Sequence, residues 1–214
     1  MREPLTISLT TAPAGLPLSL NQLKAQLRLS ADQTDEDALL MGLLRSAVEH
    51  CEAVTGRALM SQTWTLFRDA WPCGGAAVPA EGLSVGPSYD TPVRGIELPR
   101  PPLQSVIYVK TYDDSDNATT WAAANYLVDT AREPGRIVAR RGQSLPLPAR
   151  AANGIEIRFV AGYGDDPADV PEAIRHGLLL LTARLYEHRG DDMGMAARES
   201  GAARLWQTYR VLRL

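Results

Sequence analysis

The feature that most constrains the fold is a long apolar stretch over residues 169–189, DVPEAIRHGLLLLTARLYEHR. Apolar side chains recur in it at steps of four, three and four residues, so they lie on one stripe of a helix. Further apolar positions beside that stripe make it wider than a surface helix needs. We therefore expect this helix to be packed on several sides, at the centre of a core. The stripe consists of Ile174, Leu178, Leu181 and Leu185, widened by Leu179, Leu180 and Ala183.

Both ends of this helix carry boundary signals. Asp169 is a favourable N-cap, and Glu172 follows it at the capping-box spacing. Pro171 falls in the first turn, where its missing N–H costs nothing. Gly190 comes directly after the last turn and should stop the helix. The sequence therefore predicts a helix from Asp169 to Arg189.

A second long helix is predicted over residues 35–55. Acidic residues crowd its first turn, as the helix dipole favours, and Gly56 closes it. A shorter helix should begin after Ser19, which forms a capping box with Gln22. Because both long helices have an apolar stripe that must be buried, we expect them to pack together. The stripe of the second helix consists of Leu40, Leu44, Ala47, Cys51 and Val54.

The segment between the two long helices reads as β-structure. Apolar and polar residues alternate in several short runs, and turns rich in glycine and proline separate them. This order predicts an α+β fold, a small helical bundle with an inserted antiparallel β region. The expected strands lie in residues 61–68, 93–98, 105–112, the end of 121–128, 136–139 and 155–159, with a further short strand around Ile7 and Leu9.

The same signals divide the chain into four parts. Residues 1–57 form the N-terminal helical part of the core, and residues 58–166 form the inserted β region with a long Gly- and Pro-rich loop at 72–92. Residues 167–190 form the core helix. Residues 191–214 are expected to be a flexible hinge followed by a C-terminal docking segment at 202–214.

Composition excludes several classes of protein. The net charge of -3 and the pI of about 5.7 argue against a protein that wraps DNA by its backbone. No apolar run approaches the ~20 residues that a bilayer requires, and no secretion signal is visible at the N-terminus. Cys51 and Cys73 do not make a disulfide framework, and Cys51 lies on an apolar helix face. A reducing, cytoplasmic compartment is therefore expected.

One motif suggests catalysis but lacks its structural context. Residues 82–86, GLSVG, match the G-x-S-x-G pattern with Ser84 as the nucleophile. That pattern requires a sharp turn from a strand into a helix. Here Pro87 follows at once and the flanking residues indicate a loop. We therefore expect no catalytic site, although a hydrolase that uses Ser84 stays open as an alternative.

Metal and cofactor motifs are incomplete. The acidic run from Asp113 to Asn117 lacks the glycine at position six and the glutamate at position twelve of a calcium loop, so a solvated hairpin turn is expected. His50, His176 and His188 lie on predicted helices. His50 has no second ligand at helical spacing, and His176 and His188 are expected to be ordinary helix-surface or interface residues. We predict no metal and no cofactor.

The middle of the chain is locally basic. Either nucleic acid or an acidic protein neighbour would suit such a segment, but aromatic residues that could stack on bases are not interleaved with it. A DNA-binding module therefore stays open as a second alternative. The arginines concerned are Arg132, Arg136, Arg140, Arg141 and Arg150.

Four stretches together resemble a family of tailed-phage proteins, the head-to-tail connector or head-completion adaptor proteins, also found in prophages and gene transfer agents. Each stretch alone is only a structural signature, whereas their order and spacing are fairly specific. The resemblance covers nearly the whole chain. The stretches are VEHCEAVTGRALMSQTWTL (48–66), LPRPPLQSV (98–106), IRFVAGYGDDPADVPEAIRHGLLLLTARLYEHR (157–189) and TYRVLRL (208–214).

The resemblance implies a structural virion protein with no enzymatic activity. It implies a ring of identical copies, commonly twelve, that binds the portal protein and a tail-side connector or stopper protein while DNA passes through the channel. Such a protein is made in the bacterial cytoplasm and ends at the head-tail junction of the particle. A weakly acidic chain suits this channel, because attraction to phosphates would retain the DNA.

The C-terminal segment is the predicted docking element. Two of its residues are aromatic and three are arginines (Arg204, Arg210 and Arg213), types that suit an interface with an acidic portal rim. The alternative is that the segment folds back on its own bundle, since amphipathic termini often do so. The candidate docking residues are Leu205, Trp206, Tyr209, Arg210, Leu212 and Arg213.

Overall fold

The computed structural model describes residues 6–72 and 95–211, which form two compact units. The β unit comprises residues 1–10, 63–98 and 103–160, and the helical unit comprises residues 11–62, 99–102 and 161–214. Helices and antiparallel strand pairs occur together, so the predicted α+β class is confirmed. Within the described ranges, no helix is long and apolar enough to cross a membrane.

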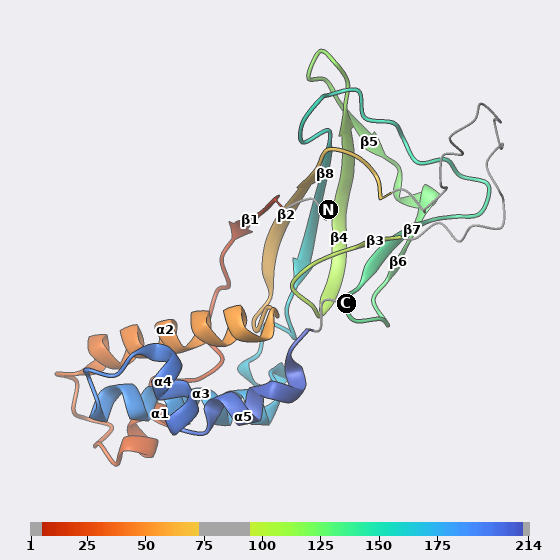
Figure 1. The fold of residues 1–214 in the computed structure, drawn as a ribbon. Helices are drawn as coiled ribbons and strands as arrows, with labels where there is room; N and C mark the ends of the chain where they lie inside the picture. The colour runs from red at the N-terminus through yellow and green to blue at the C-terminus, as the bar shows by residue number, and fades with distance from the viewer. Residues whose placement is uncertain (1–5, 73–94, 212–214) are drawn as a thin grey trace. The chain divides into compact units, whose positions relative to one another are not determined.

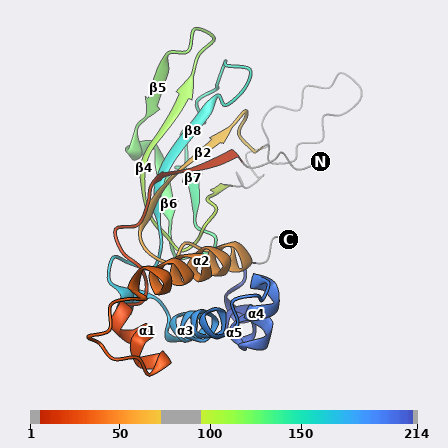
Figure 2. The same cartoon turned by 90° about the vertical axis from the view of Figure 1, so that its left-hand side faces the viewer.

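The helical unit is built around α3, the helix that the apolar stripe predicted. Figure 2 shows α3 among the other helices of the unit, and it packs against all four of them. Two single turns of 3-10 helix, η2 and η3, complete the unit. The bounds are α1 Leu20–Leu27, α2 Asp37–Thr55, η2 Pro167–Asp169, α3 Glu172–Glu187, α4 Met193–Glu199, α5 Ala202–Trp206 and η3 Gln207–Tyr209.

The core of the helical unit joins the two long helices, as predicted. Leu44 and Cys51 of α2 lie in the same fully buried cluster as Ile174, Leu178 and Leu181 of α3. Burial raises the pKa of the Cys51 thiol, so this residue behaves as a small hydrophobic side chain. Two helices that lie far apart in the sequence, α2 and α3, thus pack together in one bundle.

Two of the predicted helix caps are present. The Ser19 hydroxyl accepts a hydrogen bond from the backbone N–H of Gln22 at 3.3 Å, and the Gln22 side chain accepts one from the Ser19 N–H at 2.8 Å. Gly56 ends α2 with a positive φ of 73° and bonds back to the Glu52 carbonyl. Glycine adopts this left-handed conformation without strain, which explains why α2 ends there.

The predicted ends of the central helix were wrong by a few residues. The helix α3 begins at Glu172 and its C-cap is His188, while Asp169 belongs to the separate 3-10 turn η2. The residue before Pro171 is held extended, so a helix cannot run through that point. In η2 the Asp169 carboxylate accepts from the Asp166 N–H at 3.2 Å.

The predicted hinge is a helix. The helix α4 starts at Asp192, whose carboxylate accepts from the backbone N–H groups of Gly194 at 3.0 Å and Met195 at 3.1 Å. Its Ala196 and Ala197 are buried in the core cluster. The prediction of a hinge did not include this helix, which forms because a side-chain cap and two small residues let the polar segment pack.

The β unit contains a five-stranded and a three-stranded sheet (Figure 1). In strand order, the larger sheet consists of β1 Thr6–Thr11, β2 Gln62–Arg68, β8 Ile155–Ala161, β4 Leu103–Tyr112 and β5 Ala118–Trp121. The smaller consists of β3 Ile96–Glu97, β7 Arg136–Ala139 and β6 Tyr126–Asp129. The β4–β5, β3–β7 and β6–β7 pairs are antiparallel.

Strand prediction was accurate where residues alternate and incomplete elsewhere. Ile155, Ile157 and Phe159 on β8 are fully buried, as their spacing predicted. A strand was expected at the end of 121–128, and β6 begins there, but the strand β5, which ends at Trp121, and the 3-10 turn η1 Ala123–Asn125 were not predicted. Each of these two strands has only four residues, which is too short for the alternation of apolar and polar residues to be recognised in the sequence.

Candidate functional site

The C-terminal segment lies on its own helical bundle. Trp206, the last residue of α5, is fully buried, and its indole N–H donates to the Ile174 carbonyl at 3.3 Å. Gly177 makes room for the ring, because a Cβ at that position would lie 2.3 Å from the indole nitrogen. The segment that was predicted to dock elsewhere therefore contributes its largest side chain to the core of the helical unit.

A clamp at the end of α2 holds the residues that follow. The Nε of Arg57 donates to the Tyr209 carbonyl at 2.6 Å, and the Val211 N–H donates to the Thr55 carbonyl at 2.9 Å. The Arg57 guanidinium also lies 6.0 Å from the ring centre of Tyr163. These contacts fix the backbone of the segment up to Val211, the last described residue.

The predicted docking residues therefore differ in what they offer to a partner. Trp206 is enclosed in the bundle, Leu205 and Tyr209 are half-buried, and Arg210 is exposed. Leu212 and Arg213 lie outside the described residues. The structure shows residues 202–211 of this segment folded back on the bundle, whereas contact with another protein stays a prediction that rests on the exposed residues.

A histidine lies next to the buried indole. The rings of His50 and Trp206 are 6.3 Å apart between centres and tilted by 54°. Burial lowers the pKa of His50, while the nearby Asp192 charge acts in the opposite direction. His50 therefore packs against Trp206 at the edge of the helical core. The sequence predicted no second metal ligand at helical spacing from His50.

The β unit carries a hydrogen-bonded polar cluster that the sequence did not reveal. Glu156 of β8 is 8% exposed, and Tyr108 of β4 donates its hydroxyl to Glu156 Oε1 at 2.5 Å. Tyr112 donates to Oε2 of the same carboxylate. Lys110 and Arg158 lie over the Tyr108 ring, with cation-to-centroid distances of 4.3 and 5.0 Å. The cluster thus joins two neighbouring strands through one carboxylate.

The electrostatics of this cluster keep Glu156 ionised. Burial by itself would raise its pKa, but the two tyrosine hydrogen bonds and the charges of Lys110 and Arg158 outweigh burial and leave the pKa below its ordinary value. Burial and the hydrogen bond to Glu156 raise the pKa of Tyr108 to about 12. A carboxylate with both oxygens occupied and a lowered pKa is a structural acceptor rather than a general base.

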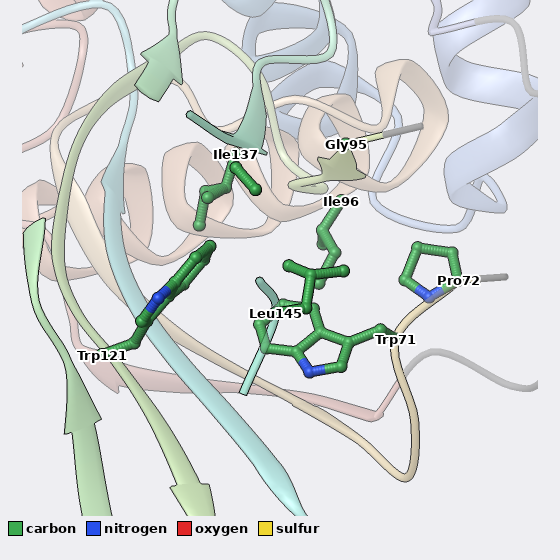
Figure 3. A pocket seen from close by; sticks show the side chains of 8 residues that line it. Trp71, Pro72, Gly95, Ile96, Trp121, Ile137 and Leu145 are labelled. Atoms are coloured by element: carbon green, nitrogen blue, oxygen red, sulfur yellow. The ribbon is translucent and has the colours of Figure 1, made fainter. Parts of the chain in front are cut away.

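Two tryptophans and several smaller apolar residues of the β unit line a small hollow (Figure 3). Trp71 and Trp121 meet at 5.7 Å between ring centres, and the Trp71 indole donates to the Pro146 carbonyl at 2.6 Å. The hollow has a volume of about 10 Å³, which is room for a single water. It is therefore a packing defect between apolar side chains and not a ligand site. Its lining also includes Pro72, Gly95, Ile96, Ile137, Ala139 and Leu145.

The structure describes some of the candidate catalytic and metal-binding motifs and not others. Ser84, Cys73 and most of the 72–92 loop lie outside the described residues. The Asp113 carboxylate accepts from the backbone N–H groups of Ser115 at 2.9 Å and Asn117 at 2.8 Å, so it shapes the predicted hairpin turn between β4 and β5. In the part of the chain that the structure describes, no group of three or more potential metal ligands occurs.

The central arginines are largely engaged with acids of the β unit. Arg136 pairs with Asp129 at 3.0 Å, and Arg132 pairs with Glu97 at 2.9 Å. Arg150 lies 3.4 Å from Asp116. Three of the five predicted basic side chains thus have an acidic partner within the same unit, which reduces the positive charge that they present to DNA.

Comparison with known proteins gives a match along the whole chain. No protein-family model and no curated protein matches the sequence. Among solved structures, a chain of "Virion of native gene transfer agent (GTA) particle" is similar at 26% identity, over 97% of this chain and 96% of that chain, with a TM-score of 0.75. The similarity therefore includes both units and is not confined to one of them.

Two structures of the particle neck also contain a chain that is similar to this one along its whole length. A chain of "Neck of empty GTA particle computed with C6 symmetry" matches at 26% identity and a TM-score of 0.73. A chain of "Neck of native GTA particle computed with C12 symmetry" matches at 25% identity and a TM-score of 0.71. Each match covers 98% of this chain and 97% of the other. The predicted resemblance to head-to-tail connector proteins is thus confirmed, and the chain is of the type of structural protein that occurs in a virion neck.

Proposed function

We propose that this chain forms a ring in the neck of a phage-like particle, where it joins the capsid portal to the tail-side proteins and leaves a channel for DNA. The end-to-end match to a neck structure with twelve-fold symmetry carries the proposal. A cyclic ring needs one surface of each copy to meet a different surface of the next, so that rotation closes the assembly.

The charge of the chain supports passage of DNA without retention. The net charge is -3, and Arg132, Arg136 and Arg150 have acidic partners. A channel wall with strong attraction for phosphates would hold the DNA by counterion release, whereas a weakly acidic wall lets it slide. The DNA-binding alternative is disfavoured for the same reason. No observation on the described residues favours the hydrolase alternative.

Deleting the gene in the bacterium that makes the particle tests the function. We expect DNA-filled heads to accumulate without tails, because the element that joins portal and tail is lost, and a plasmid copy should restore tailed particles. Electron microscopy counts the tailed particles, and mass spectrometry of purified particles detects the chain. Tailed particles at normal yield from the deletion strain would refute the connector role.

We also propose that the exposed part of the C-terminal segment contacts the portal. Arg204 and Arg210 are exposed, and the clamp formed by Arg57 holds the backbone at Tyr209 and Val211 in place. Exposed arginines on a fixed segment suit an acidic rim, where they guide association. Trp206 is excluded from this surface because it is buried.

Truncation after Tyr209 separates docking from folding. This variant keeps Trp206 in the core but loses Arg210 and the residues beyond it. Among the described residues it loses the backbone hydrogen bonds of Arg210 to Gln207 and of Val211 to Thr55, so we expect the melting temperature to change by only a few degrees. Incorporation into particles should fall at least tenfold, measured by mass spectrometry against the major capsid protein. Normal incorporation of the shortened chain would contradict the docking proposal.

A further inference from the structure

The described strands leave one long unprotected sheet edge. Edge strands expose a row of backbone N–H and C=O groups that can pair with another chain. In the larger sheet the edges are β1, with six residues, and β5, with four. In the smaller sheet they are β3, with two residues, and β6, with four. Among these edges, β1 offers the longest row.

The sequence of β1 lacks the devices that usually block pairing. Thr6–Thr11 reads TISLTT and contains no proline and no charged residue, and four of its six residues are β-branched. Five of the six are exposed, and Leu9 has 46% of its surface accessible. A strand with this composition and exposure favours the addition of another strand.

The edge is also held firmly in the sheet. The Thr10 and Thr65 hydroxyls lie 2.6 Å apart across β1 and β2. Thr65, which is 2% exposed, also accepts from Arg158 Nε at 3.3 Å, so the bonding continues into β8. Because β1 is already ordered, an added strand would not bear the entropy cost of ordering both partners.

We infer that β1 of one copy pairs with β5 of the next copy, so that the larger sheet continues around the ring; this inference rests on the proposed function. A β1–β1 contact would be two-fold and would stop at a dimer, whereas a ring needs two different surfaces. Of the described strands, β5 forms the other edge of this sheet, and its Ala118, Thr119 and Thr120 are exposed.

The two faces of the sheet provide a matched test. Thr10 shares a face with Thr65 through their hydrogen bond, and Ser8 lies on that face because side chains two residues apart in a strand do. Arg158, bonded to Thr65, lies over Tyr108, as does Lys110. Thr120 is the cross-strand partner of Lys110 and therefore lies on the same face, while Thr119 lies on the opposite one.

Cysteine pairs introduced on these strands distinguish the faces. In a Cys73→Ser background, Ser8→Cys or Thr10→Cys is combined with Thr120→Cys, or with Thr119→Cys as the control. Cys51 stays unreactive because it is fully buried. Particles are purified, oxidised with copper phenanthroline and examined on non-reducing gels. We expect a ladder of linked copies from at least one Thr120→Cys pair, and at least fivefold less from the Thr119→Cys pairs and the single variants.

Three outcomes would overturn this inference, and they differ in what else they refute. Particles that contain normal amounts of the variants but only unlinked chains would refute β1–β5 pairing and leave the connector function intact. Equal linking of pairs on the same and opposite faces would also refute it, because random collision does not distinguish faces. Absence of the wild-type chain from purified particles would instead refute the proposed function, and this inference with it.

Discussion

Replacing Trp206 with alanine is expected to lower the free energy of unfolding by about 3–5 kcal/mol, the usual cost of removing a buried aromatic side chain. Trp206 is fully buried, and its indole occupies the space that Gly177 leaves on α3. Five residues of α5 cannot form a stable helix by themselves, so without the indole the segment should detach from the bundle.

Urea titration followed by circular dichroism measures this loss, and two variants serve as controls. Trp206→Phe keeps an aromatic ring but loses the hydrogen bond to Ile174, so an intermediate loss of about 1–2 kcal/mol is expected. Leu147→Ala should have almost no effect, because Leu147 is 89% exposed. A loss below 1 kcal/mol for Trp206→Ala would mean that the indole is not part of the core.

Those parts of the fold that depend on neighbouring residues were predictable from the sequence. The stripes of α2 and α3, the Ser19 capping box and the glycine stop at Gly56 all reflect contacts within a few residues. The alternation on β8 predicted its buried face in the same way. These patterns act locally, so the sequence shows them directly.

Features that depend on distant contacts were missed. The sequence shows Trp206 in a short apolar segment after a polar stretch, and its partner Ile174 lies 32 residues away. The hydrogen bonds to Glu156 come from tyrosines 48 and 44 residues earlier in the chain. The alternation on β4 and β8 placed these side chains on polar faces, but it did not show that the two faces adjoin.

The candidate function came from the order of motifs and not from any single chemical site. Ser84 and the acidic run around Asp113 resemble catalytic and calcium sites only in part, while the four connector-like stretches extend along the chain. A ring subunit acts through its surfaces, which leave few short signatures. This explains why recognition of the class succeeded where prediction of the docking residues around Trp206 was incomplete.

Leu44→Ala in α2 and Leu181→Ala in α3 are each expected to cost about 2–5 kcal/mol, the range for leucines truncated in a core. Both side chains are fully buried and belong to one cluster that joins the two helices. Each truncation removes apolar contacts and leaves a cavity that the surrounding helices can fill only in part. The two variants thus test the packing that brings the two ends of the sequence together.

Urea titration measures both losses, and Leu39→Ala provides a matched control on α2. Leu39 is 37% exposed, so its truncation should cost under about 1 kcal/mol while the change in helix propensity stays the same as for Leu44→Ala. Equal losses for Leu39 and Leu44 would show that propensity or the unfolded state, and not burial, sets the effect. Losses under about half a kcal/mol at both Leu44 and Leu181 would refute a common core between α2 and α3, because a buried leucine cannot be truncated at so little cost.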